Sequence, residues 1–180
     1  MQLPFSASRR RLIIVWSLVS GLIHVLWEGT WSIAAPYLQS AAARHDWRLL
    51  WTLYGTADFR YVHADPFVRI LELVTGTVVA ALNLYVAHHL WKRRHVERAL
   101  LALLVVSVME VYGTVLYFGS EMLHHWANVD TASFVHTWIM FFGLNALWFA
   151  FPGWCIYELV RYYAGTRRVG FVPGGAPALG

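Results

Sequence analysis

A histidine and a glutamate stand four residues apart inside an apolar stretch near the start of the chain. In GLIHVLWEGTW, residues 21–31, His24 and Glu28 would share one face of a helix, one turn apart. Ionisable side chains at membrane depth are costly and usually face a cavity lined by protein. A carboxyl beside an imidazole can give or take a proton. The imidazole can set the protonation state of the carboxyl or relay its proton. We therefore predict that this pair belongs to a site for proton transfer.

Three later apolar stretches carry polar side chains that could complete such a site. Glu72 and Thr75 lie in the second stretch, Glu110 in the third, and Asn145 and Trp148 in the fourth. At about 1.5 Å per helical residue, the ionisable groups and the asparagine fall in one layer roughly 8–20 Å below one membrane surface. Polar groups scattered by chance would not be expected to share a layer, so we expect one buried cavity.

A dry cavity with two carboxyls suits acid–base chemistry on a lipid. One carboxyl can stay protonated in such a cavity and act as an acid, while a group in a different environment accepts a proton. The ring of Trp148 could stabilise a positive charge by about 2 kcal/mol. Together these groups could protonate one alkene carbon, hold the carbocation and remove a proton from a neighbouring carbon. The chemistry predicted is a double-bond shift that uses no cofactor and excludes water.

Each of these residues also has a structural explanation. His24 could donate to a backbone carbonyl, and Glu28 or Glu72 could be a neutral carboxyl that joins two helices. Three glutamates, a histidine and an asparagine at one depth favour a functional site over these explanations. A second group of histidines matches no standard metal-site spacing, so no metal is expected there: His124, His125 and His136.

The composition indicates an integral membrane protein. Hydrophobic residues make up 58% of the 180 residues and charged ones 13%, whereas about a quarter of a soluble domain is charged. The net charge of +4 comes mainly from short basic runs beside the apolar stretches, which argues against a nucleic-acid partner. The single cysteine, Cys155, excludes an intrachain disulfide, and no cleavable signal peptide is expected.

Four membrane-spanning helices are expected to position the site, near residues 12–35, 67–91, 99–119 and 133–163. A long polar connection, residues 37–66, follows the first helix and could include a short interfacial helix at 47–53. We expect one domain, residues 1–165, and a flexible tail, residues 166–180. The distribution of lysine and arginine predicts that both termini are cytoplasmic, in the endoplasmic reticulum if the organism is eukaryotic.

Five stretches of the sequence, in this order, resemble the emopamil-binding protein family: GLIHVLWEG, YGTADFRYVHADPF, ILELVTG, VVSVMEVYGTVLYF and LNALWFAFPG. The likeness runs in register over most of residues 21–160. Family members include sterol Δ8–Δ7 isomerases, and the broader domain is shared with the sigma-two receptor. The resemblance implies a homodimer, a sterol or terpenoid lipid as substrate, and membrane lipids as surroundings.

Carried over by position, the resemblance places the catalytic roles on His24, Glu28, Glu72, Asn145 and Trp148. We expect the substrate to contact a second set of residues: Tyr54, Tyr61, Thr75, Glu110, Tyr112, Tyr117 and Phe141. In this interpretation Asn145 orients a carboxyl, and Trp148 with Tyr112 faces the cation. Glu72 and the His24–Glu28 pair are donor and acceptor, in an order that the sequence leaves open.

The sequence departs from the family pattern on the third predicted helix. Glu110 stands where the isomerases have a glutamine, and Thr114 where they have an aspartate. The isomerases also usually have a further helix ahead of the four that they share with this chain. The leading prediction is an isomerase acting on a sterol or a related polycyclic terpenoid. The alternatives are a non-catalytic sterol or cationic-amphiphile binding protein and, less favoured, a membrane protein with a histidine-ligated haem.

Overall fold

Long apolar helices run through most of the chain, joined by one long and two shorter connections. The computed structural model describes residues 5–38 and 47–170, with side chains as far as residue 164. Within those residues, four helices are long and apolar enough to cross a membrane: Ala7–Tyr37, Pro66–Lys92, Val96–Leu123 and Val135–Ala164. They lie within a few residues of the predicted positions. The predicted four-helix membrane bundle is confirmed, and the protein is a multi-pass membrane protein.

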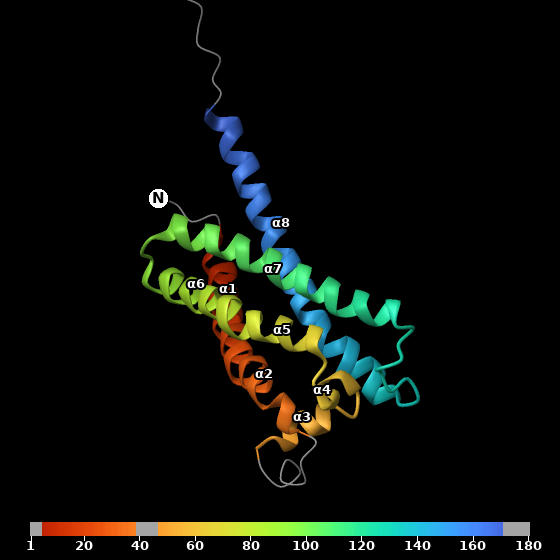
Figure 1. Cartoon of the computed structure of the whole chain (residues 1–180). Helices are drawn as coiled ribbons and strands as arrows, with labels where there is room; N and C mark the ends of the chain where they lie inside the picture. Colours follow the sequence, from red (N-terminus) through yellow and green to blue (C-terminus); the bar gives the residue numbers. More distant parts are fainter. Residues whose placement is uncertain (1–4, 39–46, 171–180) are drawn as a thin grey trace, which may run out of the picture.

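The spans are built from consecutive helical elements (Figure 1). The first span consists of α1 (Ala7–Ile23), η1 (His24–Gly29), α2 (Thr30–Ala34) and η2 (Ala35–Tyr37). The second consists of α5 (Pro66–Val74), η4 (Thr75–Val79) and α6 (Ala80–Lys92). The third span is α7 (Val96–Leu123), and the fourth joins η5 (Val135–Gly143) to α8 (Leu144–Gly170). Each span packs against the next one along the chain, and the first and fourth meet through side chains such as Trp16 and Phe151, whose rings stack with centroids 4.5 Å apart.

The start of the first span lies close to the later part of the fourth. An Arg9 Nη1 atom donates to both carboxylate oxygens of Glu158, at 2.9 and 2.8 Å. Phe5 packs in the same cluster as Leu90 and Ala99, which flank the turn between α6 and α7. That shared end is the one predicted to be cytoplasmic, and its orientation stays a prediction.

The domain boundary also stays a prediction. We predicted one domain to residue 165 and a flexible tail from residue 166. The helix α8 continues to Gly170, and the rest of the predicted tail, residues 171–180, lies outside the described residues.

Three π-helical segments interrupt the spans: η1, η4 and η5. The first two of these meet at a pair of glycines. A Cβ atom added to Gly76 would lie 2.4 Å from Gly29 Cα and 3.0 Å from the His24 carbonyl oxygen, so only glycine allows this approach. Single π-helical turns are rare and are often found at functional sites. Here the close approach brings the segment that carries His24 and Glu28 against the segment that follows Glu72.

The connection between the first two spans forms a roof over one end of the bundle. It contains α3 (Leu49–Tyr54), close to the predicted interfacial helix, and α4 (Phe59–His63), which was not predicted. Asp58 begins α4 by accepting from the backbone N–H of Arg60 at 3.1 Å. An isolated antiparallel bridge between Asp58 and Val129 joins this connection to the one before the fourth span. We use "roof" below for α3, α4 and residues 124–134.

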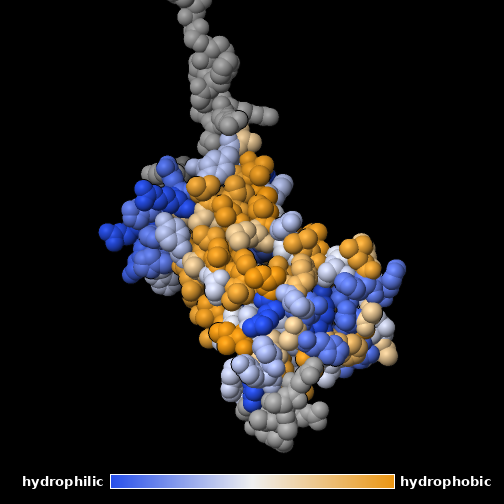
Figure 2. Space-filling model, in the orientation of Figure 1, coloured by the Kyte–Doolittle hydropathy of each residue, from blue (hydrophilic) through white to orange (hydrophobic). Residues whose placement is uncertain are grey.

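Two hydrophobic clusters lie one above the other along the bundle. One, near the α6–α7 turn, includes Ile13 and Leu103, and the other, below the roof, includes Trp31 and Phe141. Along the first span, His24 lies between the two clusters. Figure 2 shows hydrophobic residues across the middle of the visible face, with hydrophilic ones toward its two ends. This distribution is that of a protein whose middle is surrounded by lipid.

Candidate active site

A cavity of about 550 Å³ lies between the two hydrophobic clusters and is lined by residues from all four spans and from the roof. Its size is within the range typical of small-molecule sites, roughly 300–1,000 Å³. Ten of the predicted site residues line it: His24, Glu28, Tyr54, Tyr61, Glu72, Thr75, Glu110, Tyr117, Asn145 and Trp148. The rest of its wall is mainly apolar. The polar side chains expected at one depth of the helices therefore share the wall of this cavity.

His24 lies at the centre of the polar contacts in this cavity. Its Nδ1 atom is 2.6 Å from Glu28 Oε2, as the spacing of four residues predicted. Its Nε2 atom is 3.2 Å from Glu110 Oε1 and 3.1 Å from the Trp148 indole nitrogen. Because both ring nitrogens are engaged, neither is free to bind a haem iron.

Glu110 is buried behind His24, on the third span. Its Oε1 atom accepts from the Ser20 hydroxyl at 2.8 Å and from the Asn83 amide at 2.7 Å. Neither Asn83 nor Ser20 is among the residues predicted for the site. Ser20 is four residues before His24, so the same helical spacing that paired His24 with Glu28 would have placed it on this face.

Glu72 contributes a second carboxyl from the other side of the cavity. The Tyr61 hydroxyl donates a hydrogen bond to Glu72 Oε1, and Glu72 is close enough to Glu28 for their charges to interact. Burial, followed by the nearby Glu72 carboxyl, raises the pKa of Tyr61 well above its usual value. The phenol therefore keeps its proton and acts as the donor to Glu72.

Asn145 has partners other than the predicted carboxyl. Its amide nitrogen donates to the Tyr54 hydroxyl at 3.0 Å and to the Phe141 carbonyl at 2.6 Å. It therefore fixes a tyrosine of the roof over the cavity. Phe141 is fully buried behind the cavity wall, where its ring stacks on Tyr117 with centroids 5.7 Å apart.

Tyr112 does not lie where we predicted. It is 62% exposed, and the cavity lining includes Glu110, Gly113 and Thr114 but not Tyr112. Two helical residues correspond to about 200° of rotation, so Tyr112 is on the opposite face from Glu110. It cannot face a cation in this cavity.

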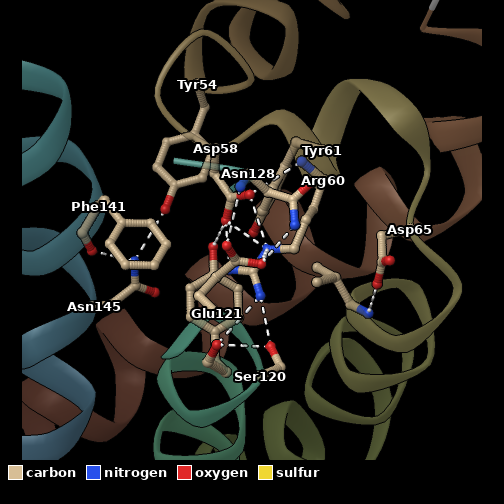
Figure 3. Close-up of polar contacts among 12 residues, drawn as sticks. Tyr54, Asp58, Arg60, Tyr61, Asp65, Ser120, Glu121, Asn128, Phe141 and Asn145 are labelled. Atoms are coloured by element: carbon tan, nitrogen blue, oxygen red, sulfur yellow. Dashed lines mark hydrogen bonds and ion pairs between the residues drawn. The ribbon is translucent and has the colours of Figure 1, made fainter. Parts of the chain in front are cut away.

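Arg60 fastens the roof to the third span (Figure 3). Its guanidinium bonds both oxygens of Asp58, the closest at 2.7 Å, and donates to Ser120 Oγ at 2.8 Å. Glu121 lies 3.3 Å away. Burial lowers the pKa of Arg60, but its hydrogen bonds to Asp58 and the nearby negative groups outweigh burial and raise it overall.

The ring of Tyr117 connects this ion-pair network to the cavity. The guanidinium carbon of Arg60 lies 4.1 Å from the centroid of that ring, and the Tyr117 hydroxyl donates to Asp58. Tyr117 also lines the cavity, so the network holds one wall of the site in place as well as its roof.

The cavity opens toward the surface between the first and fourth spans. Five leucines that line it are also 44–66% exposed: Leu22, Leu26, Leu50, Leu144 and Leu147. Leu22 and Leu26 are on the first span and Leu144 and Leu147 on the fourth, so they border the opening on both sides, with Leu50 of α3 beside it. The mouth of the cavity is therefore apolar and lies within the spans.

The chain is similar to known proteins over most of its length. A family model described as EBP, EXPERA (EXPanded EBP superfamily), matches residues 47–159. The chain is 31% identical over 160 residues to the 3-beta-hydroxysteroid-Delta(8),Delta(7)-isomerase of Rattus norvegicus, covering 89% of this chain and 68% of the relative. The Mus musculus protein of that name is 30% identical over 166 residues, with 92% and 70% covered. Isomeliandiol synthase MOI2 of Melia azedarach is 28% identical over 142 residues, with 79% and 64% covered.

Proposed function

The chain belongs to the EBP family of the expanded EBP superfamily, and on this basis we propose that it is a membrane isomerase that shifts a carbon–carbon double bond in a sterol or related polycyclic terpenoid. The observation that carries the proposal is that two carboxyls, an imidazole and an indole from three different spans line one apolar cavity. The relatives named as sterol isomerases and as a triterpenoid synthase support the two substrate classes.

Glu72 and the His24–Glu28 pair are the proton donor and acceptor. One of them protonates an alkene carbon, which leaves a carbocation at the adjacent carbon. The other removes a proton from the next carbon, so the double bond moves and the lipid gains and loses one proton overall. The hydrogen bond from Tyr61 holds one carboxyl, and the 2.6 Å contact with His24 holds the other.

Trp148 stabilises the carbocation with its ring. Its indole nitrogen lies 3.1 Å from both Ser20 Oγ and His24 Nε2, so the ring is fixed while it lines the cavity. A cation over a desolvated tryptophan gains about 2 kcal/mol, which corresponds to a rate factor of about 30. The apolar wall keeps water away from the cation.

The second candidate is a binding protein for sterols or cationic amphiphiles. It is favoured by the same pair of carboxyls, Glu28 and Glu72, because either could hold an amine inside an apolar cavity. Such a protein would bind amines without turning over an alkene.

The test is incubation of membranes containing the protein with a Δ8-sterol in heavy water. We expect a Δ7-sterol that carries deuterium at the newly saturated carbon, detected by mass spectrometry. A triterpenoid with an alkene at the corresponding ring position is tried in parallel. Amine binding without conversion of either lipid would reject the isomerase and leave the binding protein. A product without deuterium would reject alkene protonation.

A further inference from the structure

A buried carboxyl with three polar partners lies behind His24, on the side away from Glu28. The side chain of Glu110 is 1% exposed, and its neighbours are the hydroxyl, amide and imidazole groups of Ser20, Asn83 and His24. Ser20 and His24 are on the first span, Asn83 is on the second, and Glu110 is on the third. A carboxyl in this position needs donors, because burying a charge without partners is costly.

Three polar groups lie within hydrogen-bond distance of one oxygen of Glu110. Asn83 can only donate through its amide nitrogen, which lies 2.7 Å from Oε1. Ser20 Oγ accepts from the Trp148 indole at 3.1 Å, which leaves its own hydrogen for Glu110 at 2.8 Å. His24 Nε2 is the third, at 3.2 Å. Since Oε1 already accepts from the Asn83 amide and the Ser20 hydroxyl, Glu110 is placed to act as an acceptor toward His24 as well.

Glu110 as an acceptor bears on which hydrogens the His24 ring carries. With Nδ1–H directed to Glu28 and Nε2–H to Glu110, the ring would carry both hydrogens and lie between the two carboxyl groups. The Trp148 N–H, which cannot donate to a protonated nitrogen, then donates to Ser20. The titratable groups that face this unit are Glu28 on the first span, Glu72 on the second, and Glu110 on the third with Cys155 of the fourth near it.

We propose that Glu110 is a positioning residue that, held by Ser20 and Asn83, keeps His24 doubly protonated and fixed beside Glu28. The proposal rests on the proposed function only in that the His24–Glu28 pair transfers the proton. The sequence analysis placed Glu110 among substrate contacts. Its carboxyl instead acts on the substrate through His24, which holds Glu28 aligned for proton transfer.

The test combines histidine NMR with kinetics on Glu110→Gln. The protein is labelled with ¹⁵N-histidine and reconstituted in lipid nanodiscs, and the His24 signals are identified by their loss in His24→Asn. We expect both His24 nitrogens to be protonated in the wild-type protein near neutral pH. In Glu110→Gln a neutral carbonyl oxygen replaces the carboxyl oxygen that faces Nε2, so Nε2 loses its charged partner and only Nδ1 should stay protonated. The matched control is Glu97→Gln, at the exposed start of the same helix, and it should leave His24 unchanged.

The kinetic expectation follows from losing one charge-assisted hydrogen bond in a buried site. In Glu110→Gln, kcat should fall about 10- to 100-fold, with KM changed much less, because the substrate is not the partner that is lost. Ser20→Ala removes one neutral donor to Glu110 and should lower kcat in the same direction by a smaller factor.

Each outcome bears on a separate claim. A singly protonated His24 in the wild-type protein overturns the proposal, whether or not any variant folds. So does a doubly protonated His24 in Glu110→Gln, or a KM effect with unchanged kcat. If the protein does not isomerise any lipid but His24 responds as expected, the proposed function fails and the assignment of Glu110 to His24 stands.

Discussion

Replacing Gly76 by alanine should separate the first two spans and disable the site without removing any polar group. The added Cβ would lie 2.4 Å from Gly29 Cα and 2.5 Å from Gly29 N, whereas ordinary contact begins near 3.4 Å. The obstruction is backbone on both sides, so it cannot rotate away. The two π-helical segments must therefore move apart by about 1 Å, and overpacking of this kind costs about 1–3 kcal/mol of stability.

The same displacement changes the distance between the two carboxyl groups. His24 and Glu28 are on one of these segments, and Glu72 directly precedes the other. A misplacement of about 1 Å can cost on the order of 100-fold in rate. We therefore expect Gly76→Ala to lower kcat by about 100-fold and to lower the thermal unfolding midpoint, both measured in the same nanodiscs.

Three glycine variants make this a graded experiment. Gly29→Ala should be milder, because its Cβ would lie 3.4 Å from Gly76. Gly119→Ala is the matched control on α7, since an added Cβ there meets nothing within 4 Å, and alanine favours a helix. Wild-type activity and stability in Gly76→Ala would show that the close approach of the two segments does not position the site.

Three further results are expected. Glu72→Gln should abolish double-bond migration and leave thermal unfolding near wild type, with Glu97→Gln as control; near-normal turnover would remove Glu72 from the mechanism. Trp148→Leu should weaken binding of an amine analogue of the carbocation about 30-fold, and equal affinity would refute the role given to the indole. The hydrogen bond from His136 to Asp130, 2.7 Å long, lowers the pKa of that carboxyl. The stabilisation from this hydrogen bond is therefore complete above the unfolded-state pKa of aspartate, about 3.9. It is lost as the pH falls through the lower pKa that Asp130 has in the folded protein. The unfolding midpoint should consequently fall more steeply below about pH 4 in wild type than in Asp130→Asn, and identical curves would contradict this.

The spans and the composition of the cavity followed from regular features of the sequence. The length of each apolar stretch gave the helices, and counting residues along them put the ionisable groups at one depth. The contact between His24 and Glu28 required only that four residues make about one turn. These features repeat along a helix, so they can be counted without knowing which helices are neighbours.

The features that could not be predicted depend on contacts between residues that are far apart in the sequence. The π-helical segment at residues 24–29 contacts Gly76, which is 47 residues further along than Gly29, so no local pattern indicates this contact. Asn145 bonds Tyr54, a residue of the roof whose position over the cavity no local pattern indicates. Tyr112 is a different case, because its angle on the helix relative to Glu110 could have excluded it.

The apolar mouth between the first and fourth spans determines how this protein meets its ligand. A water-insoluble lipid reaches an opening of this kind from the bilayer, so the quantity that governs occupancy is its mole fraction among the surrounding lipids. Adding more phospholipid at a fixed total amount of sterol would dilute the ligand in two dimensions and raise the apparent KM. Detergent molecules with a similar tail would compete at the same opening. Rates measured in micelles and in bilayers are therefore comparable only when the ligand concentration is given as a mole fraction of the surrounding lipid or detergent.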